Sequence, residues 1–200
     1  APLASASASG HDDAAFGPGR PQRGNATLIK RSLLGTNTSV DVSLRYDILG
    51  NAIEFVDPLG RSTLASYLEN YGAPDGALSP QGASSPQSLA RLTQVTRPGG
   101  LVRRAQYDLH TGIAVDVADE NGVVTTASAS DPLDRLREVV VANGTDAASA
   151  TRYLYDDTSR TITELRDVVA LEDGQLKVET RFDALGRETE RRTFEGASTF

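Results

Sequence analysis

Apolar and polar residues alternate over short stretches of the chain, and turn-forming residues separate these stretches. The stretches are rich in Val, Ile, Thr, Tyr and Phe and are bounded by Gly, Asp, Asn and Pro, as β-strands are. In Ile113–Val117, for example, Ile113, Val115 and Val117 would share one face of a strand. The expected strands are Leu28–Leu33, Val40–Tyr46, Ile53–Val56, Leu92–Thr96, Ile113–Val117, Val123–Thr126, Thr151–Tyr155, Thr161–Leu165 and Leu176–Phe182.

Two segments also fit short helices. Asp131 and Pro132 are typical of a helix N-terminus, and Leu133, Leu136 and Val140 follow at helical spacing. A similar but shorter pattern starts at Ser85 and Pro86. For both segments, the sequence therefore fits either a short helix or a non-helical structure.

Composition divides the chain into a tail and one repeat domain. Residues 1–25 are a low-complexity segment of Ala, Ser, Gly and Pro, which buries too little apolar surface to order itself alone. We expect this tail or arm to lie on a partner's sheet edge, or else to fold back on its own domain. Residues 26–200 are expected to form the β domain, with a surface loop at 72–88 that is rich in Pro, Gly and Ser.

A short motif recurs along this domain. It consists of an aromatic residue, then Asp, then in most copies a Gly three or four residues after the Asp. The copies are Tyr46, Asp47 and Gly50; Tyr107, Asp108 and Gly112; Tyr155 and Asp156, with Ser159 near the glycine position; Phe182, Asp183 and Gly186; and a weaker copy at Asp131 with Asp134. A second element, Asp57 with Gly60 and Asp119 with Gly122, falls between the copies.

Each motif predicts the turn of a β-hairpin. An Asp carboxylate can accept hydrogen bonds from backbone N–H groups two or three residues on, and so close a turn. Glycine adopts the positive φ that such a turn needs, and Asp134 tolerates it. Ser159 tolerates it less well, so we expect the turn after Tyr155 to differ from the others.

Together, the motif from Tyr46 to Thr63, its copy from Tyr107 to Thr125 and the Phe182–Arg187 copy resemble the Rhs/YD-repeat family. That family includes bacterial polymorphic toxins, insecticidal toxin-complex components and teneurins. The resemblance covers about residues 38–195 and implies antiparallel β-hairpin repeats that form a curved sheet or partial shell. The family's self-cleaving aspartates and toxin domain have no counterpart here, so the resemblance implies a structural role.

Charge and composition argue against several kinds of partner and site. The formal net charge of −7 argues against a nucleic-acid partner, no apolar run is long enough to span a membrane, and the chain has no Cys. Its two histidines, His11 and His110, lack a serine or an acid at catalytic spacing. A metal site at His11, Asp12 and Asp13 is less plausible than a solvated charged tail. We therefore predict no catalysis, no cofactor and no bound metal.

The leading hypothesis is a structural module of a secreted or cell-surface Rhs-like assembly. Its partners would be neighbouring copies of the chain or the remainder of a larger polypeptide. The alternative is a glycan- or protein-binding adhesin module, which would need an exposed aromatic cluster among Phe16, Tyr67, Tyr71, Phe194 and Phe200. A glycosidase-like enzyme is the third possibility, and the sequons at Asn25, Asn37 and Asn143 are possible glycosylation sites.

Overall fold

The computed structural model describes residues 3–4, 6, 8–20, 22–82 and 87–195. The chain forms two compact units. The first consists of Ala1–Tyr71 with Ser79–Gln106, and the second of Gly72–Leu78 with Tyr107–Phe200. The segment expected to be one surface loop at 72–88 is therefore divided between the two units.

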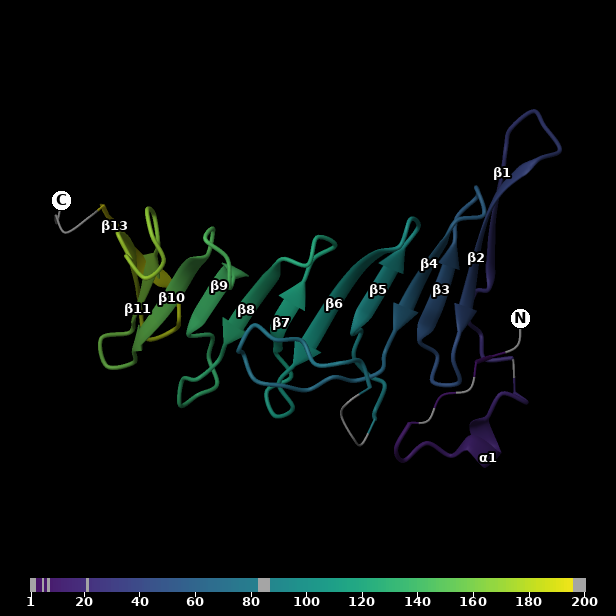
Figure 1. Cartoon of the computed structure of the whole chain (residues 1–200), viewed down its shortest axis with the longest axis horizontal. Coiled ribbons are helices and arrows are strands. Elements are labelled where there is room, and N and C mark those ends of the chain that lie inside the picture. The colour runs from purple at the N-terminus through teal and green to yellow at the C-terminus, as the bar shows by residue number, and fades with distance from the viewer. Residues whose placement is uncertain (1–2, 5, 7, 21, 83–86, 196–200) are drawn as a thin grey trace. The chain divides into compact units, whose positions relative to one another are not determined.

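The first unit is an antiparallel sheet whose strand order follows the sequence (Figure 1). Because each strand pairs with the next one along the chain, the unit is built of successive hairpins. Its elements are α1 (Asp13–Phe16), β1 (Leu28–Ser32), β2 (Ser39–Tyr46), β3 (Ala52–Val56), β4 (Ser62–Ser66), β5 (Gln94–Arg97) and β6 (Leu101–Tyr107, whose last residue belongs to the second unit).

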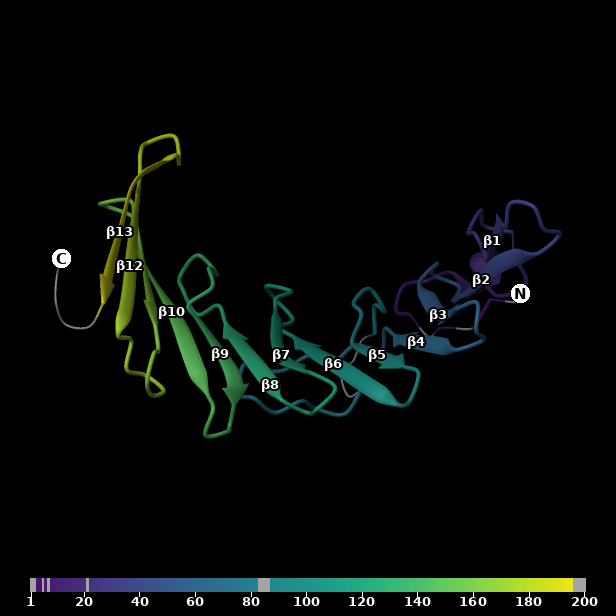
Figure 2. The same cartoon turned by 90° about the horizontal axis from the view of Figure 1, so that it is seen from above.

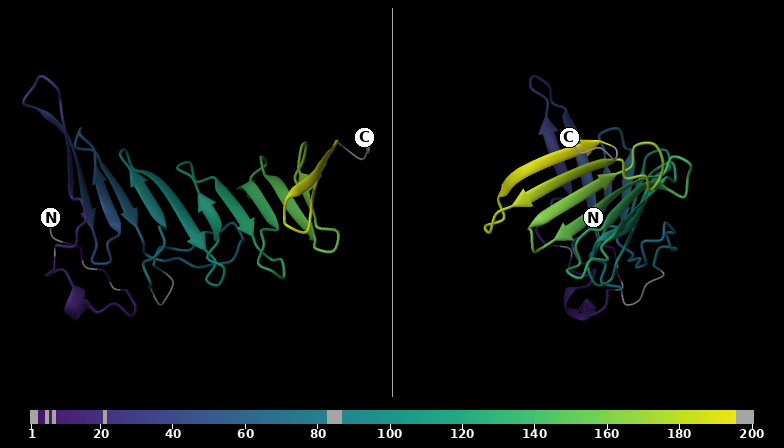
Figure 3. Two further views of the ribbon diagram at one scale, coloured as in Figure 1. Left: turned by 180° about the vertical axis from the view of Figure 1, so that it is seen from behind. Right: turned by 90° about the vertical axis from the view of Figure 1, so that its left-hand side faces the viewer.

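The second unit repeats this plan, with every strand antiparallel to its neighbour. Its strands lie in one layer (Figure 2), and β12 and β13 form the last hairpin (Figure 3). They are β7 (Ala114–Ala118), β8 (Val124–Ser128), β9 (Glu138–Asn143), β10 (Ser149–Asp156), β11 (Thr161–Arg166), β12 (Leu176–Phe182) and β13 (Glu188–Glu195).

The predicted all-β fold of antiparallel hairpins is confirmed. The possible helix from Asp131 to Val140 is wrong, because Asp131 closes a turn and Glu138–Asn143 is strand β9. Of the second possible helix, Ser85 and Pro86 lie outside the described residues, and Leu89 has φ of 56°, which is not helical. Among the described residues the one α-helix is α1, a single turn that Asp12 caps by accepting from the N–H of Ala15.

Four hairpins close with the same aspartate-centred turn. Asp183 Oδ1 accepts from the N–H of Leu185 at 2.8 Å and of Arg187 at 3.0 Å, and the N–H of Gly186 donates to the Asp183 carbonyl at 3.1 Å. The corresponding bonds recur at Asp47, Asp57 and Asp119. The third residue after each of these aspartates is a glycine with φ between 75° and 89°: Gly50, Gly60, Gly122 and Gly186.

The turns after Tyr107 and Tyr155 belong to a second, longer class. Here the aspartate accepts from the N–H groups two and three residues on, and the positive φ falls four residues on, at Gly112 (74°) and Arg160 (53°). The turn after Tyr155 therefore differs from that of Asp183, and Arg160, not Ser159, adopts the left-handed conformation.

Little apolar surface is buried in either unit. The buried apolar residues among those described are Ile48 and Leu89 in the first unit and Val115, Ala150 and Val178 in the second. Cross-strand neighbours Ile29 and Val42, and Leu44 and Phe55, share one face of the first sheet with Val40. We call these five residues the apolar face of the first unit; Ile29 is 52% and Phe55 43% exposed. The opposite face carries ion pairs, such as Lys30 with Asp41 and Arg45 with Glu54.

The described residues of the N-terminal tail lie on their own unit. Ala4 donates from its N–H to the Tyr46 carbonyl at 3.1 Å and accepts from the N–H of Ile48 at 3.0 Å, which forms a parallel bridge beside Asp47. The Arg23 guanidinium donates to the carbonyls of Phe16 and Ile48. These contacts match the folded-back alternative for the tail.

Candidate binding pocket in the first unit

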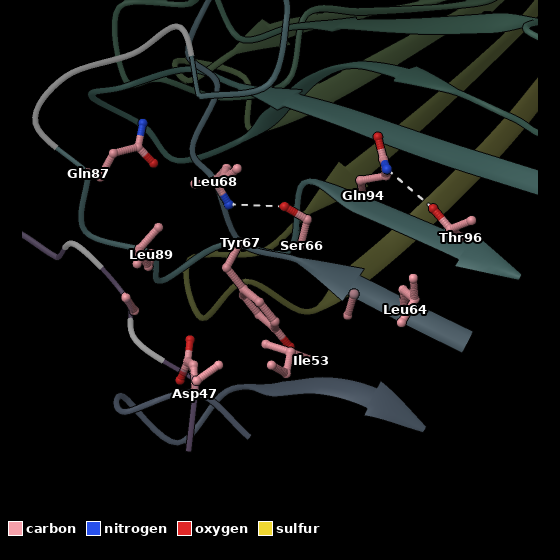
Figure 4. Close-up of a pocket in the computed structure, with 13 residues that line it drawn as sticks. Asp47, Ile53, Leu64, Ser66, Tyr67, Leu68, Gln87, Leu89, Gln94 and Thr96 are labelled. Atoms are coloured by element: carbon pink, nitrogen blue, oxygen red, sulfur yellow. Dashed lines mark hydrogen bonds between the residues drawn. The ribbon is translucent and has the colours of Figure 1, made fainter. Parts of the chain in front are cut away.

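A pocket of about 600 Å³ opens on the first unit beside β4 and β5 (Figure 4). Its volume is in the range of small-ligand sites, and its lining is mostly apolar. Tyr67 and Ile53 approach each other across it in Figure 4. The lining residues are Ala4, Ala6, Asp47, Ile53, Leu64, Ala65, Ser66, Tyr67, Leu68, Gln87, Leu89, Gln94 and Thr96.

Four parts of the chain build the walls. The hairpin of β2 and β3 supplies Asp47 and Ile53. Strands β4 and β5 supply Leu64 and Thr96, which are directly opposite each other in the ladder. The insertion between these strands supplies Leu89, which is 6% exposed. Among the described residues of the tail, Ala4 and Ala6 line the pocket. These two residues bring no side chain larger than a methyl group to this wall.

Gln94 and Thr96 lie together on one side of the pocket, and Gln87 and Asp47 border it on the other (Figure 4). Gln94 donates from Nε2 to Thr96 Oγ1 at 3.2 Å and accepts from Arg104 Nε at 3.2 Å. Burial, together with the negative charge of Asp47, raises the pKa of Tyr67 above its ordinary value. At neutral pH the Tyr67 phenol is therefore a neutral hydroxyl, which can donate or accept one hydrogen bond.

A buried glutamate holds the insertion behind the pocket. Glu69 is 1% exposed, and its carboxylate accepts from the N–H of Ser88 at 2.6 Å and from the Ser88 hydroxyl. Gln87 forms a reciprocal pair with the Glu69 backbone, at 2.6 Å and 3.2 Å. Burial by itself would raise the pKa of Glu69, but the hydrogen bonds from Ser88, Tyr71 and Ala90 outweigh it and hold the pKa below its usual value. Glu69 is thus a structural anion and a weak base.

Two further ties anchor the same insertion. Asn70 donates to the Ser79 carbonyl at 2.7 Å, and the N–H of Ser79 donates to the buried Gln106 at 2.8 Å. Gln81 donates to the buried Thr93 at 3.2 Å. Sequence reasoning missed this network because its members lie as much as 27 residues apart and share no motif.

Most aspartates of the repeat motif accept hydrogen bonds from N–H groups of their own turns. The N–H of the fourth residue on is the main cause that lowers the pKa of Asp57, Asp119 and Asp183. For Asp108 and Asp156 the main cause is the N–H of the third residue on. Asp47 is the one that also borders the pocket, and it is 5% exposed.

The aromatic ends of the motif pack locally. The Tyr155 ring lies 4.1 Å from the Arg135 guanidinium carbon, and its hydroxyl donates to the Leu136 carbonyl at 2.7 Å. The Tyr46 hydroxyl donates to the Ala26 carbonyl at 3.2 Å. Tyr107 ends β6, and Phe182 ends β12 at a break in the ladder register.

The aromatic residues outside the motif do not gather at one site. Tyr67 lines the pocket, Tyr71 contacts Glu69, and Phe16 lies near Arg20. Phe194 lies in the other unit, 5.1 Å from Lys177 Nζ, and Phe200 lies outside the described residues.

The histidines and the sequon asparagines are not among the residues that line the pocket. His11 Nδ1 contacts Asp13 at 2.6 Å, and His110 is exposed in the turn after β6. Asn25 and Asn37 are exposed, whereas Asn143 is half-buried and donates to Thr126 Oγ1 at 2.9 Å. Glycan attachment at Asn143 would have to displace this bond.

Within the described part of the chain, no three His, Cys, Asp or Glu side chains are grouped so that they could hold a metal ion. No helix there is long and apolar enough to cross a membrane. Comparison with known proteins found no matching family model and no similar protein among curated sequences.

Proposed function

We propose that the chain is a structural β-repeat module, part of an Rhs/YD-like shell or a related self-assembling secreted or surface structure. The observation that supports this most directly is the recurrence of one aspartate-closed turn in hairpins of both units. Repeats of this kind bury a continuous surface only when neighbours stack beside them. Neighbouring copies, or the rest of a larger polypeptide, would cover the apolar surface that each unit leaves exposed.

The apolar surface that stays exposed on the first unit supports this role. The apolar face of the first unit is open to solvent, and a patch of this kind marks an interaction surface in soluble proteins. The motif aspartates Asp57 and Asp183 are engaged with turn N–H groups, which lower their pKa values. A general acid requires a raised pKa instead.

Light scattering and electron microscopy of the purified chain test the proposal. A structural module should form concentration-dependent assemblies and should turn over no generic ester, peptide or glycoside substrate. A stable monomer at all concentrations, or turnover that disappears when a single Asp is replaced, would contradict it.

A binding module is the second candidate, and the pocket beside β4 and β5 favours it. Tyr67, Gln94 and Thr96 combine an aromatic ring with amide and hydroxyl groups, as glycan sites do. A glycan array separates the two functions, because selective binding to one glycan class would favour the adhesin.

A further inference from the structure

We propose that the pocket beside β4 and β5 is a binding site for an extended peptide segment of another protein, one that inserts aliphatic side chains, and that Ala4 and Ala6 of the tail are its weak intramolecular occupants. This inference does not depend on the structural role proposed above.

The backbone contact defines an extended ligand. Ala4 joins the chain beside Asp47 through two hydrogen bonds, to the Tyr46 carbonyl and from the N–H of Ile48. These partners are backbone atoms at the end of β2, so any extended peptide could make the same pair of bonds. The mode of attachment is therefore independent of the peptide's sequence.

The lining defines which side chains would fit. Leu64, Leu68 and Leu89 face a space that the methyl groups of Ala4 and Ala6 leave unfilled, at about 600 Å³. Leu64 is 48% and Leu68 47% exposed, so both retain apolar surface that a ligand could cover. Burial of additional methylene groups there would strengthen binding, which favours Val, Leu or Ile where the tail has Ala.

The same reasoning excludes the tail of a second copy of this chain as the preferred occupant. The tail of another copy would bring the same two alanines and would leave the same space unfilled. A peptide with aliphatic residues at these two alternate positions gains contacts that the tail does not make. The tail then acts as a competitor that such a ligand must displace.

The pocket wall is already organised for binding. The pairing of Gln87 with the Glu69 backbone and of Glu69 with Ser88 holds the insertion in place beside the pocket. A ligand would therefore not have to order this wall, and ordering is a main cost of peptide binding.

Two fluorescein-labelled peptides test the proposal against the full chain by fluorescence anisotropy. One has the chain's own sequence, Leu-Ala-Ser-Ala-Ser-Ala-Ser, and the other replaces its first two alanines with valine and leucine. We expect the second peptide to bind at least about tenfold more tightly than the first. Equal affinities, or no anisotropy change with either peptide up to millimolar protein, would overturn the proposal.

Substitutions in the chain locate the site. The double variant Ala4→Val with Ala6→Leu should fill the pocket from within, raise the melting temperature and weaken the aliphatic peptide at least about tenfold. The matched control Ala14→Leu, on the exposed face of α1, should leave binding unchanged. If the double variant unfolds, Leu64→Gln should weaken binding while Leu59→Gln, at an exposed turn, should not. Unchanged binding in both pocket variants would also overturn the proposal.

Discussion

At the scale of single residues, the turn glycines matter because a residue without a side chain readily adopts positive φ. Gly186 has φ of 75°, and a Cβ added there would meet no heavy atom within 4 Å. The cost of a substitution at this position is therefore conformational and not steric crowding. A β-branched residue adopts positive φ poorly, whereas Asn tolerates it.

We expect Gly186→Val to lower the free energy of unfolding by about 1–3 kcal/mol. Gly186→Asn should recover most of this loss, and His110→Ala should change the stability little because His110 is exposed. Urea denaturation of the three variants measures the effect. Equal midpoints for the valine and asparagine variants would show that the positive φ is not required.

Asp173 gives the clearest dependence on pH at this scale. The N–H groups of Ala170, Val169, Val168 and Gln175 donate to its carboxylate and lower its pKa to about 2. A depressed pKa in the folded state gives stability that is present above the ordinary carboxyl pKa and is lost as pH falls toward 2.

We expect the Asp173 carboxyl to titrate near pH 2 by carbon-detected NMR, and the backbone of 168–175 to lose hydrogen-exchange protection as pH falls from about 4 to 2. Asp173→Asn cannot titrate and should reduce the pH dependence of that protection; the part that remains belongs to Asp167, which accepts from the N–H groups of Glu172 and Gly174 in the same loop. A titration near pH 4 would contradict the hydrogen-bonded loop.

At the scale of elements, strands that flank a local turn signal could be predicted from the sequence, whereas β4, β6 and β9 were not among the expected strands. The segment Asp57–Arg61 carries its turn within five residues, and β2, β10, β11 and β12 follow the alternation on either side of such turns. The possible helix at Asp131 failed for the same local reason. Asp131-Pro132-Leu133 satisfies helix-capping rules, but Asp134 adopts φ of 57° and Arg135 bonds back to Asp131 as Arg61 does to Asp57.

The candidate pocket could not be predicted, since its walls come from distant segments. Nothing in the composition of the tail indicates that Ala4 pairs beside Asp47, or that Glu69 meets Ser88. Strand β13 was anticipated only as a mixed-charge face, because Glu and Arg alternate there without an apolar pattern.

The insertion between β4 and β5 should depend on Glu69. Removing the carboxylate by Glu69→Ala leaves the Ser88 N–H and hydroxyl without their acceptor, at a cost of about 1–3 kcal/mol to local order. We expect subtilisin to cleave residues 72–88 faster in this variant than in the wild-type chain. The control is Glu172→Ala, at an exposed glutamate of the other unit. Equal cleavage rates in the two variants would show that Glu69 does not hold the insertion.

At the scale of the whole molecule, the small buried core makes association the expected behaviour. The apolar face of the first unit would be covered by whatever lies against it, and Phe55 lies within this face. A charge placed within this face should oppose association, because a partner would have to desolvate it.

We expect Phe55→Glu to reduce the mean mass in static light scattering at a given concentration. Leu59→Glu, which places the same charge on a turn leucine that is 76% exposed, is the matched control and should have little effect. If both variants retain the mass of the wild-type chain, the apolar face does not mediate association.

The pairing of each strand with the next one along the chain also affects how the polypeptide folds during synthesis. Within each unit a strand needs only the strand just before it, so a hairpin can form as soon as it leaves the ribosome. The pairing of β4 with β5 is the exception, because β5 cannot join until residues 67–93 have been made. We therefore expect translation to pass a point, just after β4, at which the outer edge of β4 stays unpaired until β5 has been made and the nascent chain is most in need of a chaperone.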